Sequence, residues 1–342
     1  MSPRALTTLF RWLLRGLLIV AALGGVGALW ESLAERRDRT AYPPPGRMVE
    51  AGGHRLHLRI EGAGQPGPTV ILEVGIGGAT SCNWGWVRPE VARFAPVVAY
   101  DRGGLGWSEP GPLPRDGRRL VTELHTALAN AGVAGPFVFV GHSYGGLLAR
   151  LFTDAYPGEV AGLVLAEPSH PDMFARAPDF RHIVRSIRWA VGPAPLVARL
   201  GLIRAALPWI HTDVEVLPPA DGAAQRAFLA SPAHWRGVIA ELDSWERDTS
   251  PEARATGGFG DRPVIVLTAG TSARARGRWS QLQAATAALS SDHLQRVVPG
   301  ATHGSIVNDR RYAVAVTDAV REVVEAVRTG QRLAPPPAPT SR

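Results

Sequence analysis

Short apolar runs alternate with amphipathic stretches along most of this 342-residue chain. The apolar runs are four to six residues long and rich in β-branched and aromatic side chains, which is typical of buried strands. We expect strands at residues 55–60, 69–74, 97–100, 137–140, 162–166, 263–268 and 294–298. Helices are expected at residues 117–130, 145–156, 278–289 and 311–328. This alternation predicts an α/β fold, a mostly parallel sheet with helices on both faces.

The alternation stops between about residues 168 and 261. This stretch is rich in Pro, Arg and Trp, and its pattern indicates short helices and no strand. It is too long for an ordinary connection, so we interpret residues 169–260 as an inserted helical cap. The core then consists of two parts, 41–168 and 261–330. The Pro-rich residues 331–342 are expected to form a disordered tail.

The chain begins with an apolar segment. Residues 12–30 contain one charged side chain, Arg15, and approach the roughly 20 residues that span a bilayer as a helix. Arginines cluster at the start of this segment, which predicts a cytoplasmic N-terminus and an extracytoplasmic body. Small residues near its end also suit a signal peptidase, which would give a secreted protein instead. We therefore expect a membrane anchor or a cleaved signal at 1–40, followed by a stiff spacer at 42–46.

Charge and cysteine content exclude several classes of function. The formal net charge is +7, but it includes no basic run, so we expect no nucleic-acid partner. The single cysteine, Cys82, excludes an internal disulfide and disfavours a Cys-ligated zinc site. His54 and His57 lie in or beside an early strand without a nearby carboxylate or cysteine cluster, and we interpret them as packed or solvent-facing. Nothing in the sequence indicates a cofactor or metal, and the oligomeric state stays open.

The hexapeptide Gly-His-Ser-Tyr-Gly-Gly at residues 141–146 separates an expected strand from an expected helix. A Gly-x-Ser-x-Gly sequence in this context is typical of a nucleophile elbow, a sharp turn that exposes a serine hydroxyl. Gly141 and Gly145 lack side chains where neighbouring backbone segments approach each other. We therefore expect Ser143 to be a catalytic nucleophile, and we interpret His142 as supporting the turn.

A serine nucleophile needs a general base and an oxyanion hole. His303 follows the expected strand 294–298 and precedes the last helix, so it lies at the same edge of the sheet as Ser143. We expect His303 to be the base. The backbone N–H of Tyr144 would supply one oxyanion donor. The Gly-rich loop after strand 69–74 would supply the second, and counting from the end of that strand points to the N–H of Ile76.

The acid that orients the base is found by elimination. The usual position is the loop after strand 263–268, but residues 263–291 contain no Asp or Glu. Glu167 closes the strand that ends at Ala166, so its carboxylate lies at the active edge. We infer that Glu167 orients His303 and stabilises its charged form. Asp172 is the alternative.

Two further segments carry expectations. In the loop 101–108 we expect Asp101 and Arg102 to pair with each other and shape the backbone. In the cap, residues 196–210 are apolar, as are the aromatic residues Trp189, Trp235, Trp245 and Phe228. We expect these side chains to present an apolar surface over Ser143, which predicts a lipophilic ester substrate. Packing of the cap onto the core and contact with a membrane surface are alternatives for them.

Together these motifs resemble the α/β-hydrolase superfamily, in its branch with a helical cap. The resemblance spans about residues 46–328 and rests on four segments, namely 73–78, 101–108, 141–146 and 299–303. The chain is similar to membrane-tethered or exported members of this superfamily that have a Tyr-Pro-Pro-Pro-Gly spacer. The resemblance implies the nucleophile, base and oxyanion hole named above. Val74-Gly75 replaces the common His-Gly before the oxyanion residue, and the acid is displaced to an earlier strand, as in some dehalogenases of this fold.

These expectations predict a serine hydrolase that acts on carboxylic esters and resembles carboxylesterases, with Ser143, His303 and Glu167 as a catalytic triad. Dehalogenases and epoxide hydrolases that resemble it carry Asp at the elbow, which disfavours those activities. Thioesterase, peptidase, cofactor-free haloperoxidase and acyltransferase activities stay open. From another class, the chain could be an inactive ligand-binding protein that retains the pocket. The expected partners are a small-molecule substrate and a membrane, through the N-terminal helix.

Overall fold

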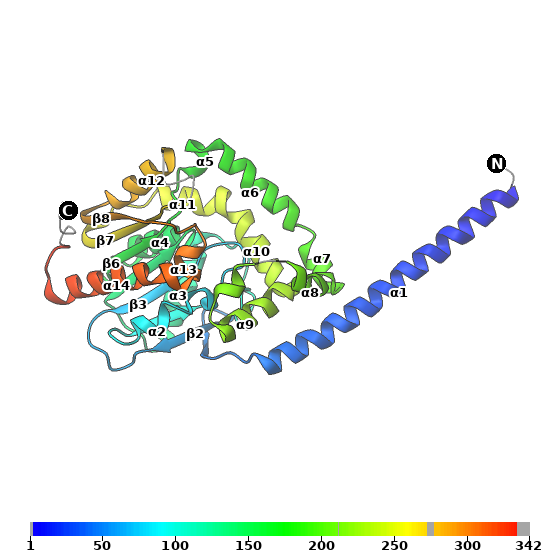
Figure 1. The fold of residues 1–342 in the computed structure, drawn as a ribbon, viewed down its shortest axis with the longest axis horizontal. Helices are drawn as coiled ribbons and strands as arrows, with labels where there is room; N and C mark the ends of the chain where they lie inside the picture. The colour runs from blue at the N-terminus through cyan, green and yellow to red at the C-terminus, as the bar shows by residue number, and fades with distance from the viewer. Residues whose placement is uncertain (1–2, 211, 272–276, 334–342) are drawn as a thin grey trace.

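An eight-stranded sheet forms the centre of the body in the computed structural model, which describes residues 3–210, 212–271 and 277–333 (Figure 1). The strand order is β1-β2-β4-β3-β5-β6-β7-β8. β1 and β2 run antiparallel to their neighbours, and all later pairs are parallel. The strands are β1 (Arg47–Glu50), β2 (Arg55–Glu61), β3 (Thr69–Glu73), β4 (Val97–Tyr100), β5 (Phe137–His142), β6 (Val160–Ala166), β7 (Gly260–Ala269) and β8 (Ser290–Val298).

Helices cover both faces of the sheet, as the alternating pattern predicted. One face carries α3 (Gly117–Asn130), α4 (Gly145–Ala155) and α12 (Arg278–Ala287). The other face carries α2 (Arg88–Val91), α13 (Ser305–Asn308) and α14 (Arg310–Thr329). Along β5, Phe137 and Phe139 pack into the first layer, whereas Val138 and Val140 pack into the second. Strands buried on both faces are apolar at every position, which is why the sequence shows them as continuous runs.

All seven expected strands are present, and β1 is an addition. β1 has only Met48 and Val49 as apolar residues, which is too short a run to be recognised as a strand. β8 begins at Ser290, four positions before the expected start, because its first residues are polar. The pattern therefore predicted the order and the apolar centres of the strands better than their ends. The expected disordered tail lies mostly outside the described residues, which end at Leu333.

A helical insertion connects β6 to β7, and its described part, which omits residue 211, contains no strand. Its elements are α5 (Met173–Arg176), α6 (Pro178–Val191), α7 (Ala194–Arg199), α8 (Leu202–Ala206), η2 (Leu207–Trp209), η3 (Asp213–Val216), α9 (Pro219–Ala230), α10 (Pro232–Ser244), η4 (Trp245–Thr249) and α11 (Ser250–Arg254). His234 on α10 contacts Gly78 in the loop after β3 and Gly106 in the loop after β4. The insertion therefore lies over the C-terminal ends of the parallel strands.

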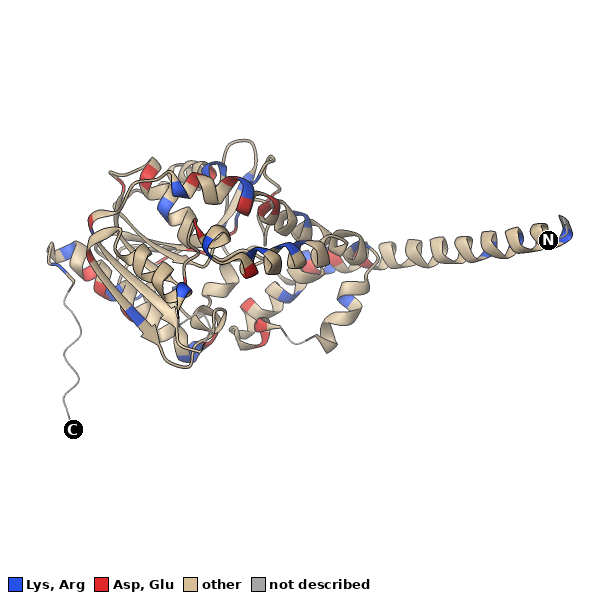
Figure 2. Ribbon diagram, turned by 90° about the horizontal axis from the view of Figure 1, so that it is seen from above, with Lys and Arg blue, Asp and Glu red and all other residues tan. Residues whose placement is uncertain are grey.

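The N-terminal helix α1 (Pro3–Ala41) is long and apolar enough to cross a membrane by length and composition. Figures 1 and 2 show that it projects from the body, with few charges along its outer part. Its last part packs directly on the helical insertion, where Glu31 pairs with Arg204. The expected spacer at 42–46 therefore does not hold the helix away from the body. The sequence could not show this, because the partner lies more than 170 residues along the chain.

Candidate active site

Ser143 occupies a strained turn between β5 and α4. Its φ of 53° lies in the left-handed region that most residues avoid. The two flanking glycines permit this turn: a Cβ on Gly141 would lie 2.7 Å from the Gly145 carbonyl oxygen, and one on Gly145 would lie 2.5 Å from that of Glu73. The Ser143 N–H donates to the Ala166 carbonyl of β6 at 3.1 Å. The neighbouring strands therefore hold the turn in its strained conformation.

His303 lies beside the Ser143 hydroxyl. It belongs to the loop between β8 and α13, at the carboxyl end of the parallel strands. Its Nε2 is 2.9 Å from Ser143 Oγ, and its Nδ1 is 3.4 Å from Glu167 Oε2. The side chain is one-third exposed, whereas Glu167 is fully buried. The structure thus brings together the three side chains that the sequence singled out.

Glu167 is fixed as firmly as the serine. It is the other non-glycine residue with a positive φ among the described residues, at 49°. Its N–H donates to the Leu267 carbonyl at 2.7 Å, and its Oε1 accepts from the Ala269 N–H at 2.6 Å, so β7 holds both ends of the residue. Its second oxygen faces His303. The alternative acid, Asp172, accepts a hydrogen bond from Arg254 at 2.6 Å instead, and this contact lowers the pKa of Asp172.

The expected oxyanion donors lie next to the serine. A Cβ on Gly75 would approach the Ser143 Cβ to 3.3 Å, so the loop after β3 runs against the elbow. Ile76 lines the cavity in front of Ser143. Among the described residues, neither the Ile76 N–H nor the Tyr144 N–H donates a hydrogen bond to protein. Two unpaired amides at this place suit a developing negative charge on a substrate oxygen.

A cavity of about 330 Å³ opens in front of Ser143 and His303. One part of its wall is apolar, with Ile76, Val214 and Leu229. The other part is polar and includes these residues: Asn83, Thr212, Asp213, Gln225 and Asn308. The Thr212 hydroxyl is buried there without a hydrogen-bond partner among the described residues. The cavity is therefore of mixed polarity.

The predicted apolar cap surface over Ser143 is wrong in its residues. Trp189 and Trp209 are 84% and 81% exposed and do not line the cavity. Trp245 is buried and packs against the rings of Tyr144 and Phe174. The apolar pattern of residues 196–210 gave no information about which way the short helices face, because each is shorter than two turns.

His142 supports the loop that carries His303. Its ring donates a hydrogen bond from Nε2 to the His303 carbonyl at 2.8 Å. Burial, together with the neighbouring His303, lowers the pKa of His142 to about 3, so the ring is neutral at physiological pH. The turn that carries Ser143 thus also holds the loop that carries His303. The sequence indicated only the first part of this role.

Arg102 is a buried residue whose partners the sequence did not identify. Its guanidinium contacts Glu73 of β3 at 2.7 Å and Glu241 of α10 at 2.7 Å, and it donates to the Gly75 carbonyl at 2.7 Å. The expected pairing with Asp101 is wrong, because Asp101 accepts from His57 at 2.9 Å instead. Arg102 therefore ties the oxyanion loop to the helical insertion. Glu73, at the end of the apolar strand β3, was the one sequence signal for a buried acidic partner of Arg102.

The two early histidines are structural. His57 pairs with Asp101, and His54 lies 3.4 Å from Glu123, with all four side chains buried. No group of three or more possible metal ligands occurs within the described part of the chain. This arrangement leaves each histidine one carboxylate, which is too few ligands for a stable metal site.

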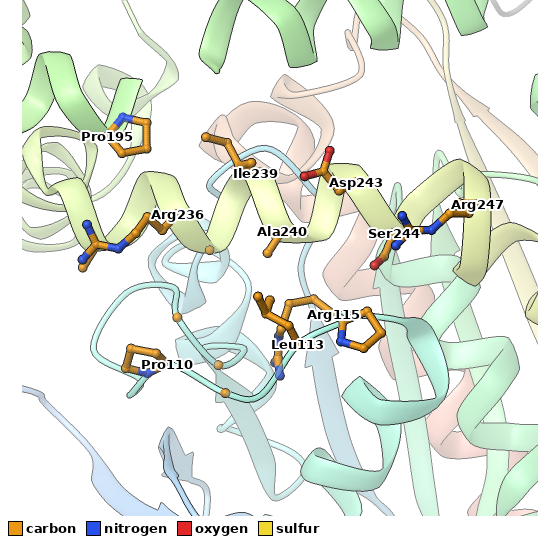
Figure 3. Close-up of a pocket in the computed structure, with 16 residues that line it drawn as sticks. Pro110, Leu113, Arg115, Pro195, Arg236, Ile239, Ala240, Asp243, Ser244 and Arg247 are labelled. Carbon is orange, nitrogen blue, oxygen red and sulfur yellow. The ribbon is translucent and has the colours of Figure 1, made fainter. Parts of the chain in front are cut away.

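A larger groove of about 790 Å³ lies between the loop after β4 and helix α10 (Figure 3). Its described lining is mostly Gly, Pro and Ala, with Arg236 and Asp243 on α10 and Arg247 on η4. Ser143, His303 and Glu167 are not among its described lining residues. The smaller cavity is the better candidate for the chemistry, because the described lining of the larger groove includes no histidine beside its one serine, Ser244.

Comparison with known proteins supports this interpretation of the fold. The 2-hydroxy-6-oxo-2,4-heptadienoate hydrolase of Pseudomonas putida is 37% identical over 245 residues, which are 65% of this chain and 82% of that protein. Lipase LipV of Mycobacterium tuberculosis is 34% identical over 122 residues, or 33% of this chain and 42% of that protein. The chain spans less than half of other curated relatives, 21% of the efuK protein of Hormonema carpetanum and 43% of YqjL of Bacillus subtilis.

Solved structures share the same architecture. The crystal structure of the DBJA mutant dbja delta has a TM-score of 0.64 at 17% identity, and the match covers 83% of this chain and 99% of that chain. A thermophilic esterase from Thermogutta terrifontis has a TM-score of 0.57 at 22% identity, with 82% and 97% covered. At such identities the likeness concerns the fold alone. Residues 74–317, however, match the Alpha/beta hydrolase family, and the chain therefore belongs to that family.

Proposed function

We propose that the protein is a serine hydrolase that cleaves carboxylic esters through an acyl-enzyme intermediate. The observation that carries this proposal is the 2.9 Å contact between Ser143 Oγ and His303 Nε2 on a strained elbow that faces a cavity. Ser143 Oγ attacks the ester carbonyl while its proton moves to His303. The C–O bond to the alcohol then breaks, and His303 returns the proton to the leaving alcohol.

Water completes the cycle. His303 removes a proton from a water molecule, whose oxygen attacks the acyl carbon. The bond between that carbon and Ser143 Oγ then breaks, His303 returns the proton to Ser143 Oγ, and the acid leaves. Glu167 accepts a hydrogen bond from His303 Nδ1–H, which fixes the tautomer with a free Nε2 and stabilises the imidazolium. The N–H groups of Ile76 and Tyr144 would stabilise the oxyanion in both tetrahedral intermediates.

The cavity wall favours an uncharged ester. Asp213 is the acidic residue of the described lining, which includes no Arg or Lys. An anionic substrate such as the dienoate in the name of the Pseudomonas putida relative would face repulsion from Asp213 and find no cation to pair with. A lipophilic ester stays our prediction, supported by the apolar wall of Ile76, Val214 and Leu229. Acyl transfer to an acceptor other than water uses the same intermediate.

We further propose that α1 crosses a membrane once, with the N-terminus in the cytoplasm. Arg4, Arg11 and Arg15 lie near the N-terminal end of the helix, and the charges at its other end are mixed. Packing of α1 on the helical insertion also supports an uncleaved anchor. Cleavage after Ala34 would remove Glu31 from its buried pair with Arg204. Cleavage after Ala28 would remove Gly27 from its close contact with Leu200.

Covalent labelling tests the catalytic proposal. Full-length protein in detergent is treated with a fluorophosphonate probe, in the wild type and in Ser143→Ala, with the exposed Ser186→Ala as a matched control. We expect labelling of the wild type and the control, and none of Ser143→Ala. A folded wild type that does not react would contradict the hydrolase proposal and favour a ligand-binding protein. Full labelling of Glu167→Gln would redirect the acid role to Asp172.

A further inference from the structure

The helical insertion exposes a set of large apolar side chains away from the cavity. We call it the apolar cap face and define it by these residues: Trp189, Leu196, Leu202, Trp209 and Ile210. They come from the end of α6 through η2, a stretch of about 20 residues. Large exposed apolar patches on a protein mark a surface that contacts a partner or a membrane.

The same stretch touches α1 at its backbone. A Cβ on Gly27 would lie 2.4 Å from the Leu200 carbonyl oxygen, and one on Gly201 would lie 2.5 Å from the Trp30 ring. The contact therefore needs glycine on both sides. Leu200 and Gly201 lie between Leu196 and Leu202, so the contact with α1 is continuous with the apolar cap face.

Ion pairs fix this arrangement immediately beyond the apolar part of α1. Arg204 pairs with Glu31 at 2.8 Å and with Asp38 at 2.7 Å, and Glu31 is fully buried. Arg199 pairs with Glu35 at 3.4 Å. These pairs define how far the insertion sits along α1, because all three acids follow Trp30, the last residue of the apolar segment.

The depth of the contact can be calculated from helix geometry. An α-helix rises about 1.5 Å per residue, so Gly27 and Gly24 lie roughly 4.5 and 9 Å along α1 from Trp30 into the apolar segment. Helices that bind at a membrane interface bury their apolar face roughly 5–10 Å deep. Leu200 meets α1 at Gly24, within this depth range, and at Gly27, at its shallow limit.

We propose that the apolar cap face inserts into the interfacial layer of the same bilayer that α1 crosses. This inference rests on the proposed membrane insertion of α1. The helices Pro178–Arg199 and Leu202–Trp209 together are apolar enough to pass as a span, but they bend by 100°, which suits a segment lying in the interface. The polar pairs of Arg199 and Arg204 then lie at the level of the lipid headgroups.

The arrangement also places the membrane next to the active site. Ile210 ends the apolar cap face, and Thr212, Asp213 and Val214 line the cavity in front of Ser143. An amphiphilic ester in the bilayer would therefore reach the cavity rim without crossing bulk water. The exposed apolar residues that the sequence assigned to the substrate pocket would instead position the enzyme at the surface that contains its substrate.

Lipid quenching tests the insertion. Single cysteines replace Leu196, Trp209, Val314 or Leu18 in the full-length chain, and each carries an environment-sensitive fluorophore. Cys82 does not interfere, because it is fully buried and burial raises the pKa of its thiol. The proteins are reconstituted in phosphatidylcholine vesicles that contain brominated acyl chains. We expect strong quenching at residues 18, 196 and 209, and none at residue 314, an exposed apolar position on α14.

The outcomes separate the possible failures. Quenching at residue 18 without quenching at 196 and 209 overturns the proposal and leaves the anchor intact. Absence of quenching at residue 18 shows that α1 is not inserted, which overturns both. The fluorophore at residue 209 could instead report an apolar environment that depends on protein concentration and not on brominated lipid. That result indicates a second copy of the chain on this face and also overturns the proposal. None of these readouts depends on catalysis, so Ser143→Ala gives the same quenching if the proposal is right.

A kinetic test addresses the link to substrate. The cap variant combines Leu196→Gln with Trp209→Gln. The control variant combines Leu113→Gln with Val314→Gln, which remove exposed apolar side chains elsewhere. We expect the cap variant to hydrolyse a long-chain ester in vesicles at least about tenfold more slowly than the control, as lost apolar burial predicts. Hydrolysis of a water-soluble short-chain ester should be equal in both. Equal loss on both substrates would overturn access from the membrane.

Discussion

Among the buried carboxylates that face histidine rings in the described residues, Glu167 and Asp101 form two instructive pairs, and only in the Glu167 pair does the histidine ring contact a serine hydroxyl. His303 Nδ1 lies 3.4 Å from Glu167, and His57 Nδ1 lies 2.9 Å from Asp101. The second nitrogen of each ring also accepts a hydrogen bond. In His303 the donor is the Ser143 hydroxyl at 2.9 Å, and in His57 it is the Gly46 N–H at 3.1 Å.

The difference lies in the third partner and in access to solvent. A serine hydroxyl can give up its proton and attack a carbonyl carbon, whereas a backbone amide cannot. The His303 side chain is 34% exposed and lines a cavity, whereas His57 is fully buried. The shorter, better-formed pair is therefore the structural one. A histidine–carboxylate pair by itself indicates little about function, and the nucleophile and the cavity decide it.

Replacing the two histidines would separate the pairs most strongly. We expect His303→Asn to lower kcat by at least about 10⁴-fold, because no base remains, while its unfolding free energy stays close to that of wild type. His57→Asn should keep kcat but lose about 3–5 kcal/mol of stability, because Asp101 would remain buried without its partner. Ester hydrolysis and urea unfolding measure both effects. Loss of activity in a folded His57→Asn protein would break the comparison.

The carboxylates should follow the same division with smaller effects. Glu167→Gln removes the group that holds the His303 tautomer, so we expect kcat to fall by about 10³–10⁴-fold with little change in KM. Asp101→Asn is the matched control, since Asp101 accepts from His57 and from the Ser81 N–H rather than from the base. It should unfold at lower urea concentration with kcat near wild type. Equal kcat in Glu167→Gln and wild type would exclude Glu167 as the acid.

Removing the support beneath the base should have a modest effect. His142→Phe deletes the hydrogen bond to the His303 carbonyl, and we expect kcat to fall about tenfold, the equivalent of one hydrogen bond. His142→Gln retains a donor and should recover part of the loss. Steady-state kinetics of the two variants measures the difference. Identical rates for Phe and Gln would show that the ring contributes packing alone.

The smallest expected effect is on the pH dependence of stability. Burial lowers the pKa of His234 to about 4, although its hydrogen bond to the Gly78 carbonyl raises it, and burial lowers the pKa of His142 to about 3. In the unfolded chain both would titrate near pH 6.5. The unfolded state therefore binds more protons below that pH, and stability is fully present above about pH 6.5 and falls as the pH decreases toward 4. Urea midpoints at about pH 7 and about pH 5 measure this loss. His234→Gln should reduce it, and an unchanged slope would contradict the assignment.

Much of the candidate site followed from local sequence. Ser143 is recognisable because strand, glycine turn and helix must follow one another within a few residues. Glu167 was found because a carboxylate directly after an apolar strand must lie at the active edge of a parallel sheet. The structure places both beside His303, and their catalytic roles stay predictions that the variants above test. The family is established by the match of residues 74–317.

The contacts of the helical insertion did not follow from sequence. The insertion aligns Glu241 with Arg102 and Arg204 with Glu31, and each pair joins residues more than 130 positions apart. The hypothesis of an Asp101–Arg102 pair failed for the same reason. The two side chains bind partners from distant segments, Asp101 to His57 and Arg102 to Glu73 and Glu241, rather than each other. Short helices also leave the direction of their apolar side chains open, so Trp209 was assigned to the cavity rather than to the surface.

The sequence by itself determined the order of strands and helices, the elbow at Ser143 and the apolar length of α1, because these depend on side-chain periodicity and on backbone conformations available to neighbouring residues. Only the tertiary structure decided that His57 pairs with Asp101, which residues line the cavity, and how the insertion packs on α1. Those features depend on buried ion pairs and close backbone contacts between distant segments. A buried charge must find an oppositely charged partner wherever the folded chain brings one, because an unpaired buried charge is strongly destabilising. The local sequence pattern does not predict which distant residue that partner is.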